Sequence, residues 1–334
     1  MMENTQGLRV ISLFSGCGGM DLGFIMAGHS IVWANDFDKD SCDTYEANFN
    51  YRPICAKIED IKSEEIPEAD VVIGGFPCQG FSIANPYRKI EDSRNKLYLE
   101  LLRIIKDKHP LYFVAENVVG LCSIGGYENE KDRKNHQGRV LKAILKELEN
   151  ANEYKYNVEF KILNSADFGV PQLRRRVIIL GTRKDVIPIL KHPTPTHSQD
   201  QWFTVEEALR GLPEEPNQEI PNHVGTLHKV KINGYIGNRA IDPFKPSPTI
   251  VGRGGGTGGP IIIPHPNKKR RMTVREVARL QCFPDKFIFK DSISSQYRQI
   301  GNAVPWPLAY NIAKMLPKPS QISYLQSEVA QLVE

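Results

Sequence analysis

The chain has 334 residues, of which 40% are hydrophobic and 25% charged, and its 43 basic and 39 acidic side chains leave a net charge of +4. These values are typical of a folded globular protein with one large domain or two ordinary ones, and the net charge neither requires nor excludes nucleic acid. No apolar run approaches the ~20 residues that a membrane span requires, and the N-terminus lacks the apolar segment of a secretory signal peptide. The cysteines form no C-x-x-C pair, which argues against a zinc site. We therefore expect a cytoplasmic chain without metal.

The first predicted unit is a strand, a glycine turn and a helix. Residues 8–14 (LRVISLF) predict the strand, Gly16, Gly18 and Gly19 fall in the turn, and residues 20–27 predict an amphipathic helix. Glycines allow the backbone to approach a ligand, and a helix N-terminus offers unpaired N–H groups, so this unit favours nucleotide-type binding. Its G-x-G-G spacing differs from the G-x-G-x-x-G dinucleotide fingerprint, which argues against an NAD-dependent oxidoreductase.

The second predicted strand ends in an acid. Residues 30–35 (SIVWAN) predict the strand, Asp36 closes it, and Phe37 follows. An acid about 20 residues past a glycine loop is suited to bind ribose hydroxyls, and Phe37 is suited to stack on adenine. The alternative is that Asp36 is an N-cap for the helix predicted over residues 39–49. The upstream glycine loop favours the ribose role.

The stretch 74–82, GGFPCQGFS, follows a buried strand predicted at residues 71–73. Pro77 stiffens the turn and so fixes Cys78 at the carboxyl end of that strand, where open α/β sheets bind ligands. Cys78 is therefore a candidate nucleophile. The alternative is a small buried residue in a tight loop.

Further strands and helices alternate through residue 184. Helices are predicted at 97–108 and 139–149, and strands at 53–61 (with a turn), 111–115, 158–163 and 177–180. This alternation predicts an α/β fold with a doubly wound, mostly parallel sheet. Glu116 follows the strand at 111–115 and places a second polar group at a strand's carboxyl end. Strand alternation puts Arg174 and Arg176 on one face and Arg175 on the other.

The composition changes after about residue 184. Residues 185–271 are rich in Pro, Gly, Asn and His, which predicts a smaller, loop-rich second domain with little helix. A glycine loop at 252–259 and a basic cluster at 268–271 would suit a DNA groove and its phosphates, and the alternative is a flexible linker. Beyond it we predict a helix at 272–284 with a Thr273–Glu276 capping box, a Gly-Asn turn at 298–303, a helix at 306–316 and a surface helix at 320–334.

Eight motifs, in this order, resemble those of DNA (cytosine-5) methyltransferases: LFSGCGGMDLGF, NDFD, GGFPCQGFS, EDSRNKL, FVAENV, QLRRR, RMTVREVARLQCFP and QIGNAV. The resemblance covers residues 8–184 and 272–314. It implies a Rossmann-like catalytic domain, formed by residues 1–184 and 272–334, that binds S-adenosylmethionine. It further implies a DNA target-recognition domain at residues 185–271 and double-stranded DNA as the substrate.

The resemblance also implies a chemistry for the candidate residues. Cys78 matches the family nucleophile, which adds to carbon 6 of cytosine and so activates carbon 5. Glu116 matches the group that binds N3 of the base. Arg176 is expected to stabilise charge on the ring carbonyl, and Arg174 to support the same pocket or the catalytic loop. Because the base is inaccessible in a duplex, it must be flipped out.

One position departs from the family's cofactor-binding pattern, which has an Asp-Ile pair after the third strand. Here ungapped alignment back from Cys78 gives Lys57-Ile58, and Asp60-Ile61 lies three residues later, so we retain Ile58 and leave out Lys57. The cofactor contacts that the resemblance implies are Phe14, Gly16, Gly18, Gly19, Asp36, Phe37, Ile58, Pro77, Leu97, Asn302 and Val304.

DNA contacts are expected at Gln79, Ser82, Arg239, Arg253, Thr257 and Arg270. Thr257 and Arg239 are candidate base-reading side chains, whereas Arg270 belongs to the basic cluster expected to anchor phosphates. We expect a monomeric bacterial enzyme, either stand-alone or paired with a restriction endonuclease that acts on the same site. The alternatives are an RNA cytosine-5 methyltransferase on the same scaffold, which the long loop-rich domain disfavours, and a catalytically silent DNA-binding protein, which Cys78 and Glu116 disfavour.

Overall fold

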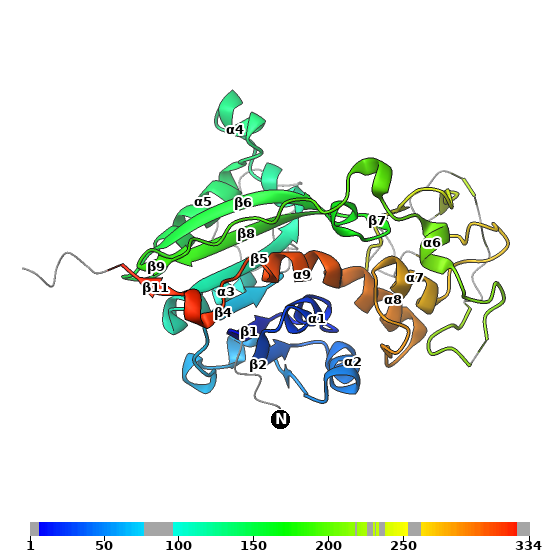
Figure 1. Cartoon of the computed structure of the whole chain (residues 1–334), viewed down its shortest axis with the longest axis horizontal. Helices are drawn as coiled ribbons and strands as arrows, with labels where there is room; N and C mark the ends of the chain where they lie inside the picture. Colours follow the sequence, from blue (N-terminus) through cyan, green and yellow to red (C-terminus); the bar gives the residue numbers. More distant parts are fainter. Residues whose placement is uncertain are drawn as a thin grey trace, which may run out of the picture.

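The computed structural model describes residues 7–76, 96–217, 219–225, 230, 232–233, 238–252 and 262–325. Its centre is a seven-stranded sheet in the order β3-β2-β1-β4-β5-β8-β6 (Figure 1). The neighbours from β3 to β5 are parallel, and β8 runs antiparallel to both β5 and β6. The predicted α/β fold with a mostly parallel sheet is therefore confirmed. The strand order reverses between β1 and β4, where such sheets open a crevice for ligands.

The strands are β1 (Arg9–Leu13), β2 (Ser30–Asp36), β3 (Ile54–Cys55), β4 (Val71–Gly74), β5 (Tyr112–Val118), β6 (Tyr156–Asn164), β7 (Gln172–Leu173), β8 (Arg175–Arg183), β9 (Val186–Ile187), β10 (Ser247–Pro248) and β11 (Ser323–Tyr324). The helices are α1 (Gly19–Met26), α2 (Lys39–Phe49), α3 (Lys96–Lys108), α4 (Glu130–Lys134), α5 (Arg139–Glu149), α6 (Val205–Leu209), α7 (Val274–Leu280), α8 (Ile293–Asn302) and α9 (Trp306–Ala313).

Helices cover both faces of the sheet because its strands are apolar on both sides. On β1, Val10 packs in the cluster that includes residues of α1 and α9, whereas Ile11 packs in the cluster that includes residues of α3 and α5. Successive side chains of a strand point to opposite faces, so one strand serves both layers. A Cβ added at Gly23 would lie 2.5 Å from the Cβ of Ala309, so α1 and α9 pack closely only because Gly23 has no side chain.

A second core lies at one end of the sheet, where α6, α7 and α8 lie beside loop-rich segments (Figure 1). Val205, Ile241 and Ile262 share this core with Val277 of α7 and Ile300 of α8. It therefore draws residues from both sides of the predicted domain boundary at 271/272, and the boundary itself stays a prediction. In the described residues between 185 and 271, α-helix is limited to α6, which agrees with the loop-rich character expected there.

A buried arginine ties this second core together. Arg275 has no exposed surface and donates hydrogen bonds to the carbonyl oxygens of Pro221, Pro284 and Phe287, at 2.9, 2.9 and 2.6 Å. Burial lowers the pKa of its guanidinium to about 10. At the start of the same helix the predicted capping box is confirmed, because Thr273 and Glu276 exchange hydrogen bonds.

Two predictions about the C-terminal region are wrong. Residues 298–303 do not form a Gly-Asn turn, since Arg298 through Asn302 belong to α8. Residues 320–325 do not form a helix that continues toward the C-terminus, because Ser323 and Tyr324 pair antiparallel with Ile187 and Val186 as strand β11. The remainder of that predicted helix, 326–334, lies outside the described residues.

Among the helices of the described ranges, none combines the length and apolar character that a membrane crossing requires. Those ranges also contain no grouping of His, Cys, Asp and Glu side chains that could hold a metal ion.

Candidate active site

The candidate site lies where the carboxyl ends of β1, β4 and β5 meet at one edge of the sheet. Phe14 follows β1, Gly75 and Phe76 follow β4, and Glu116 lies near the end of β5. The parallel pairing of β1 with β4 and of β4 with β5 aligns these ends. The sheet order thus brings together residues that are about 100 positions apart in the chain.

Glu116 and Arg176 form a buried ion pair at this edge. Nε of Arg176 lies 2.7 Å from Oε1 of Glu116, and the two side chains are 10% and 12% exposed. The antiparallel register of β5 and β8, which pairs Val118 with Arg176, brings the two side chains together. A Cβ added at Gly75 would lie 3.1 Å from Oε2 of Glu116, so this carboxylate sits directly against the backbone that leads to Cys78. Cys78 and Pro77 lie outside the described residues.

Asn117 is a site residue that the sequence analysis missed. Its buried side chain donates from Nδ2 to the carbonyl oxygen of Phe76 at 3.0 Å, and its Oδ1 accepts from the backbone N–H of Val118 at 2.8 Å. It therefore holds the backbone at the last described residue before Pro77. Its position next to Glu116 in the ENV motif was the available signal.

Arg174 lies behind the ion pair and is itself buried. It donates from Nη1 to the carbonyl oxygen of Ile250 at 2.8 Å and from Nη2 to that of Gly301 at 3.1 Å. Burial lowers the pKa of its guanidinium well below the usual range. Arg174 and Arg176 are buried whereas Arg175 is exposed, so the predicted alternation is confirmed. These contacts show Arg174 joining the start of β8 to the second core, and its support of the catalytic pocket stays a prediction.

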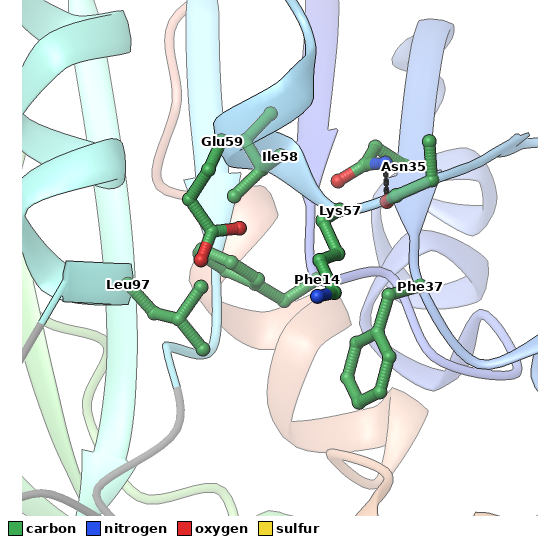
Figure 2. Close-up of a pocket in the computed structure, with 8 residues that line it drawn as sticks. Phe14, Asn35, Phe37, Lys57, Ile58, Glu59 and Leu97 are labelled. Carbon is green, nitrogen blue, oxygen red and sulfur yellow. Dashed lines mark hydrogen bonds between the residues drawn. The ribbon is translucent and has the colours of Figure 1, made fainter. Parts of the chain in front are cut away.

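A cavity of about 150 Å³ opens beside the ends of β1 and β2 (Figure 2). The structure brings four of the predicted cofactor residues together in its lining. It also adds Asn35, Ala56 and Glu59, which the sequence analysis missed, and Lys57, which it left out. The lining residues are Phe14, Asn35, Phe37, Ala56, Lys57, Ile58, Glu59 and Leu97.

Asp36 is held by the glycine loop. Its Oδ2 accepts the backbone N–H of Gly16 at 2.8 Å and its Oδ1 accepts that of Asp38 at 2.8 Å. Burial raises the pKa of the Asp36 carboxyl, and the two backbone donors oppose that shift. The N-cap position of α2 belongs to Asp38, not to Asp36. The carboxylate therefore bonds to the glycine loop and does not occupy the N-cap position, which favours the ribose role over the capping role.

The glycines of the loop differ in what they do. Gly16 has φ +55°, and a Cβ added there would meet no atom of the described residues within 4 Å, so its backbone borders open space. A Cβ at Gly18 would lie 2.4 Å from the ring of Phe49, and one at Gly19 would lie 2.5 Å from the carbonyl oxygen of Val304. Gly16 therefore suits close approach of a ligand, whereas Gly18 and Gly19 are required by packing. Asn302, at the end of α8, lies against Gly252.

A fully buried carboxylate, Asp21, lies in the first turn of α1. It accepts hydrogen bonds from the hydroxyls of Ser12 and Tyr45, both at 2.7 Å. No ion pair joins Asp21 to a cation among the described residues, and burial raises the pKa of its carboxyl from 3.8 to about 6. Ionisation of Asp21 therefore costs folding free energy.

The titration of Asp21 should make the unfolding free energy of the protein depend on pH. Because its pKa is raised on folding, its favourable contribution is complete below about pH 3.8 and is lost as the pH rises through about 6. Relative to Asp21→Asn, the wild type should lose about 3 kcal/mol of unfolding free energy across that window, since one pKa unit corresponds to about 1.4 kcal/mol. Urea unfolding of both proteins at several pH values from 4 to 7 measures this difference. Parallel stability curves would show that Asp21 does not titrate as described.

Most predicted DNA contacts lie outside the described residues, namely Gln79, Ser82, Arg253 and Thr257. Arg239 is exposed, and its base-reading role stays a prediction.

The phosphate-anchoring role predicted for Arg270 does not fit the structure. Its Nε donates to the carbonyl oxygen of Glu214, and its Nη1 and Nη2 donate to the two carboxylate oxygens of Glu276, each at 2.7 Å. Further bonds from Nη1 to the carbonyl oxygen of Arg271 and from Nη2 to that of Glu214 complete the set. A guanidinium has five N–H donors, so none remains for a phosphate. Arg270 is instead an internal partner of Glu276, and the exposed Lys268 and Lys269 are the cluster members open to phosphate.

Comparisons with known proteins agree with this geometry. A family model described as C-5 cytosine-specific DNA methylase matches residues 8–318. The Type II methyltransferase M.NgoFVII of Neisseria gonorrhoeae is 36% identical over 338 residues, which cover 92% of this chain and 86% of the relative. The Type II methyltransferase M.FnuDI of Fusobacterium nucleatum is 37% identical over 337 residues, which cover 92% and 94%. A candidate DNA modification methyltransferase encoded within an E. coli prophage superposes with a TM-score of 0.68 at 26% identity, covering 92% of this chain and 98% of that one.

Proposed function

Because the chain belongs to the family of C-5 cytosine-specific DNA methylases, we propose that it transfers a methyl group from S-adenosylmethionine to carbon 5 of a cytosine flipped out of duplex DNA. The observation that carries this proposal is the buried Glu116–Arg176 pair, which lies against Gly75 at the edge that also holds the cavity. A carboxylate held against Gly75, which precedes Cys78 by three positions in the sequence, suits recognition of a base during covalent catalysis.

The cavity and the glycine loop fit the proposed cofactor. Phe14, Phe37, Ile58 and Leu97 provide apolar and aromatic surface for a purine ring, and the Asp36 carboxylate, held by two backbone donors, retains lone pairs for ribose hydroxyls. When bound, S-adenosylmethionine supplies an electrophilic methyl group. The residues proposed to hold it are those that line the cavity, together with Gly16, Asp36, Asn302 and Val304.

The proposed role of the protein in the reaction is to make cytosine nucleophilic. The Cys78 thiolate adds to carbon 6 of the base, and the electron pair of the 5,6 double bond becomes available at carbon 5. In this proposal Glu116 binds N3, and Arg176, which forms an ion pair with Glu116, stabilises charge that develops on the ring carbonyl. Methyl transfer would leave S-adenosylhomocysteine as the other product. A water molecule then accepts the proton from carbon 5, and the electron pair left behind re-forms the 5,6 double bond and expels the Cys78 thiolate.

Type II methyltransferases among the relatives support a place in bacterial DNA modification. We propose a cytoplasmic, monomeric enzyme that acts on double-stranded DNA, either alone or alongside a restriction endonuclease that cuts the same site. No direct contact with that nuclease is required. Extrusion of the base from the stack costs a few kcal/mol. In this proposal, contacts between the protein, including its second core, and the DNA offset that cost.

Sequencing after bisulfite treatment tests this function directly. DNA from cells that express the protein should show cytosine methylation in one short sequence context, and purified protein should transfer label from S-adenosylmethionine to duplex DNA. Label that enters tRNA and not DNA would support the RNA methyltransferase alternative. DNA binding without any label transfer would support a catalytically silent protein.

Asp36→Asn should weaken cofactor binding more than it slows methyl transfer at saturation. The variant removes a charge-assisted hydrogen bond, and such bonds contribute about 1.5–3 kcal/mol each, so the Kd for S-adenosylhomocysteine should rise by roughly ten- to a hundredfold. Isothermal titration calorimetry measures the change. Asp43→Asn is the matched control, because Asp43 lies on α2 and pairs with Lys39 and Arg52 outside the cavity lining. An unchanged Kd in Asp36→Asn would return Asp36 to a purely structural role.

A further inference from the structure

The polar groups that line the cavity are few and differ in what they can offer a ligand. Five of the eight lining residues are apolar, and the other three are Asn35, Lys57 and Glu59. Nδ2 of Asn35 donates to the carbonyl oxygens of Ile54 and Ala56, both at 2.8 Å, so both of its hydrogens are used within the protein. Lys57 can only donate, and Glu59, when ionised, can only accept. Glu59 is therefore the anionic acceptor of this lining.

The local backbone determines which acid reaches the cavity. A short 3-10 helix, Ile58–Asp60, begins directly after Lys57 and turns the side chain of Ile58 into the core, where it is 2% exposed. Figure 2 shows the Glu59 carboxylate beside Leu97 and Phe14, at the side of the cavity opposite Phe37. Asp60, the next residue, is not part of the lining. Two adjacent exposed acids on one turn therefore differ in access to the cavity.

The Glu59 carboxylate also has no competing partner in the described part of the chain. No hydrogen bond or ion pair joins its side chain to another described residue, whereas Asp36, on the neighbouring strand, is held by two backbone donors. An anionic acceptor at the rim of an apolar cavity with two phenylalanines favours an aromatic ring that bears an N–H donor on its edge.

We propose that Glu59 accepts a hydrogen bond from the exocyclic amino group of the cofactor's adenine and thereby selects a 6-aminopurine over a 6-oxopurine. The proposal rests on the function proposed above, in which S-adenosylmethionine occupies the cavity. A 6-oxopurine presents an oxygen where adenine presents two N–H donors, so its 6-position would face the Glu59 carboxylate with like partial charge and could donate no hydrogen bond. Glu59 is thus a specificity-determining residue, and the sequence analysis assigned no acid of this segment to the cofactor.

Calorimetry with two product analogues tests the proposal. The probes are S-adenosylhomocysteine and S-inosylhomocysteine, which differ in the 6-position of the purine, and the proteins are the wild type, Glu59→Gln and Asp60→Asn. The wild type should prefer the adenine compound by about tenfold or more, as expected for a hydrogen bond to a charged group. Glu59→Gln should reduce the preference to about threefold or less, because an amide can donate to a 6-oxo group as well as accept from a 6-amino group. Asp60→Asn should retain the wild-type preference.

Two results would overturn the proposal while leaving the proposed function intact. One is a wild-type preference that persists in Glu59→Gln, and the other is an equal loss of preference in Asp60→Asn. Failure of the wild type to bind either compound would instead overturn the cofactor assignment, and the Glu59 proposal with it. Because the Glu59 side chain is exposed and forms no hydrogen bond or ion pair with another described residue, an unchanged thermal unfolding midpoint in Glu59→Gln confirms that the comparison is between folded proteins.

Discussion

Replacement of Cys78 by alanine is expected to abolish methyl transfer while leaving binding of DNA and S-adenosylhomocysteine nearly unchanged. In the proposed reaction only the Cys78 sulfur forms a bond to carbon 6, and no other step makes carbon 5 nucleophilic. Loss of a catalytic group of this kind lowers kcat on the order of 10⁴-fold or more. Transfer of labelled methyl groups to duplex DNA, measured in single-turnover conditions, reports the change.

The control for this variant is another cysteine of the same chain. Cys55 is exposed on β3 and lies outside the cavity lining, so Cys55→Ala should retain wild-type kcat. DNA that carries a cytosine with fluorine at carbon 5 should form a denaturation-resistant adduct with the wild type and with Cys55→Ala, because fluorine cannot leave as a proton does. An adduct with Cys78→Ala, or turnover above a few per cent, would contradict the assignment.

Glu116→Gln is expected to lower kcat by about 10²–10⁴-fold, the range over which a positioned acid or base acts. The glutamine can still accept from Nε of Arg176, so the local fold should survive, but it cannot exchange a proton with N3 of the base. The Kd for S-adenosylhomocysteine should not change, since Glu116 is absent from the cavity lining. The measurement pairs single-turnover methylation with calorimetry.

The matched control is Glu147→Gln. Glu147 lies on α5 and accepts a hydrogen bond from the Tyr98 hydroxyl at 2.9 Å, so it is also an acid with a structural partner, but it is not one of the residues at the sheet edge. Its variant should retain kcat. A Glu116→Gln enzyme within tenfold of wild-type kcat would show that Glu116 only holds Arg176.

The sequence predicted the sheet and the cavity side of the site well because both depend on local patterns. The predicted bounds of α2 and α5 match the structure, and the glycine turn and Asp36 lie where a strand-turn-helix unit requires them. Periodicity and turn chemistry act over a few residues, so they can be interpreted from one sequence. Phe14 and Leu97, by contrast, were assigned from the resemblance to DNA (cytosine-5) methyltransferases, and both line the cavity.

The errors came from contacts between distant segments. Gly301 was interpreted as a turn residue, but it belongs to α8 and is small because a Cβ there would lie 2.3 Å from the backbone nitrogen of Gly252. Ser323 and Tyr324 form a strand only because Val186 and Ile187 offer an edge. In both cases the structure depends on a contacting segment more than 40 residues away in the chain. The residues around each position therefore gave no signal of that contact in the sequence.

Arg270 illustrates the same limit for charge. Four consecutive basic residues, 268–271, indicate an anion-binding surface, yet the fold directs every N–H of Arg270 to Glu276 and to main-chain carbonyl groups. A run of charges in a sequence therefore does not reveal which members are committed internally. Glu59 is the converse case, since a one-residue difference in the turn decides which of two neighbouring acids faces the cavity.

The packing of α1 against α9 has a consequence for synthesis of the protein on the ribosome. The helix that carries the glycine loop docks on a helix encoded near the end of the chain, and the backbone of Val304 closes directly over Gly19. A nascent chain therefore cannot finish the nucleotide side of its site until Val304 and α9 have left the exit tunnel. Chains stalled before α9 should expose the apolar faces of α1 and β1 and depend on chaperones, and binding competence should arise only after α9 has emerged.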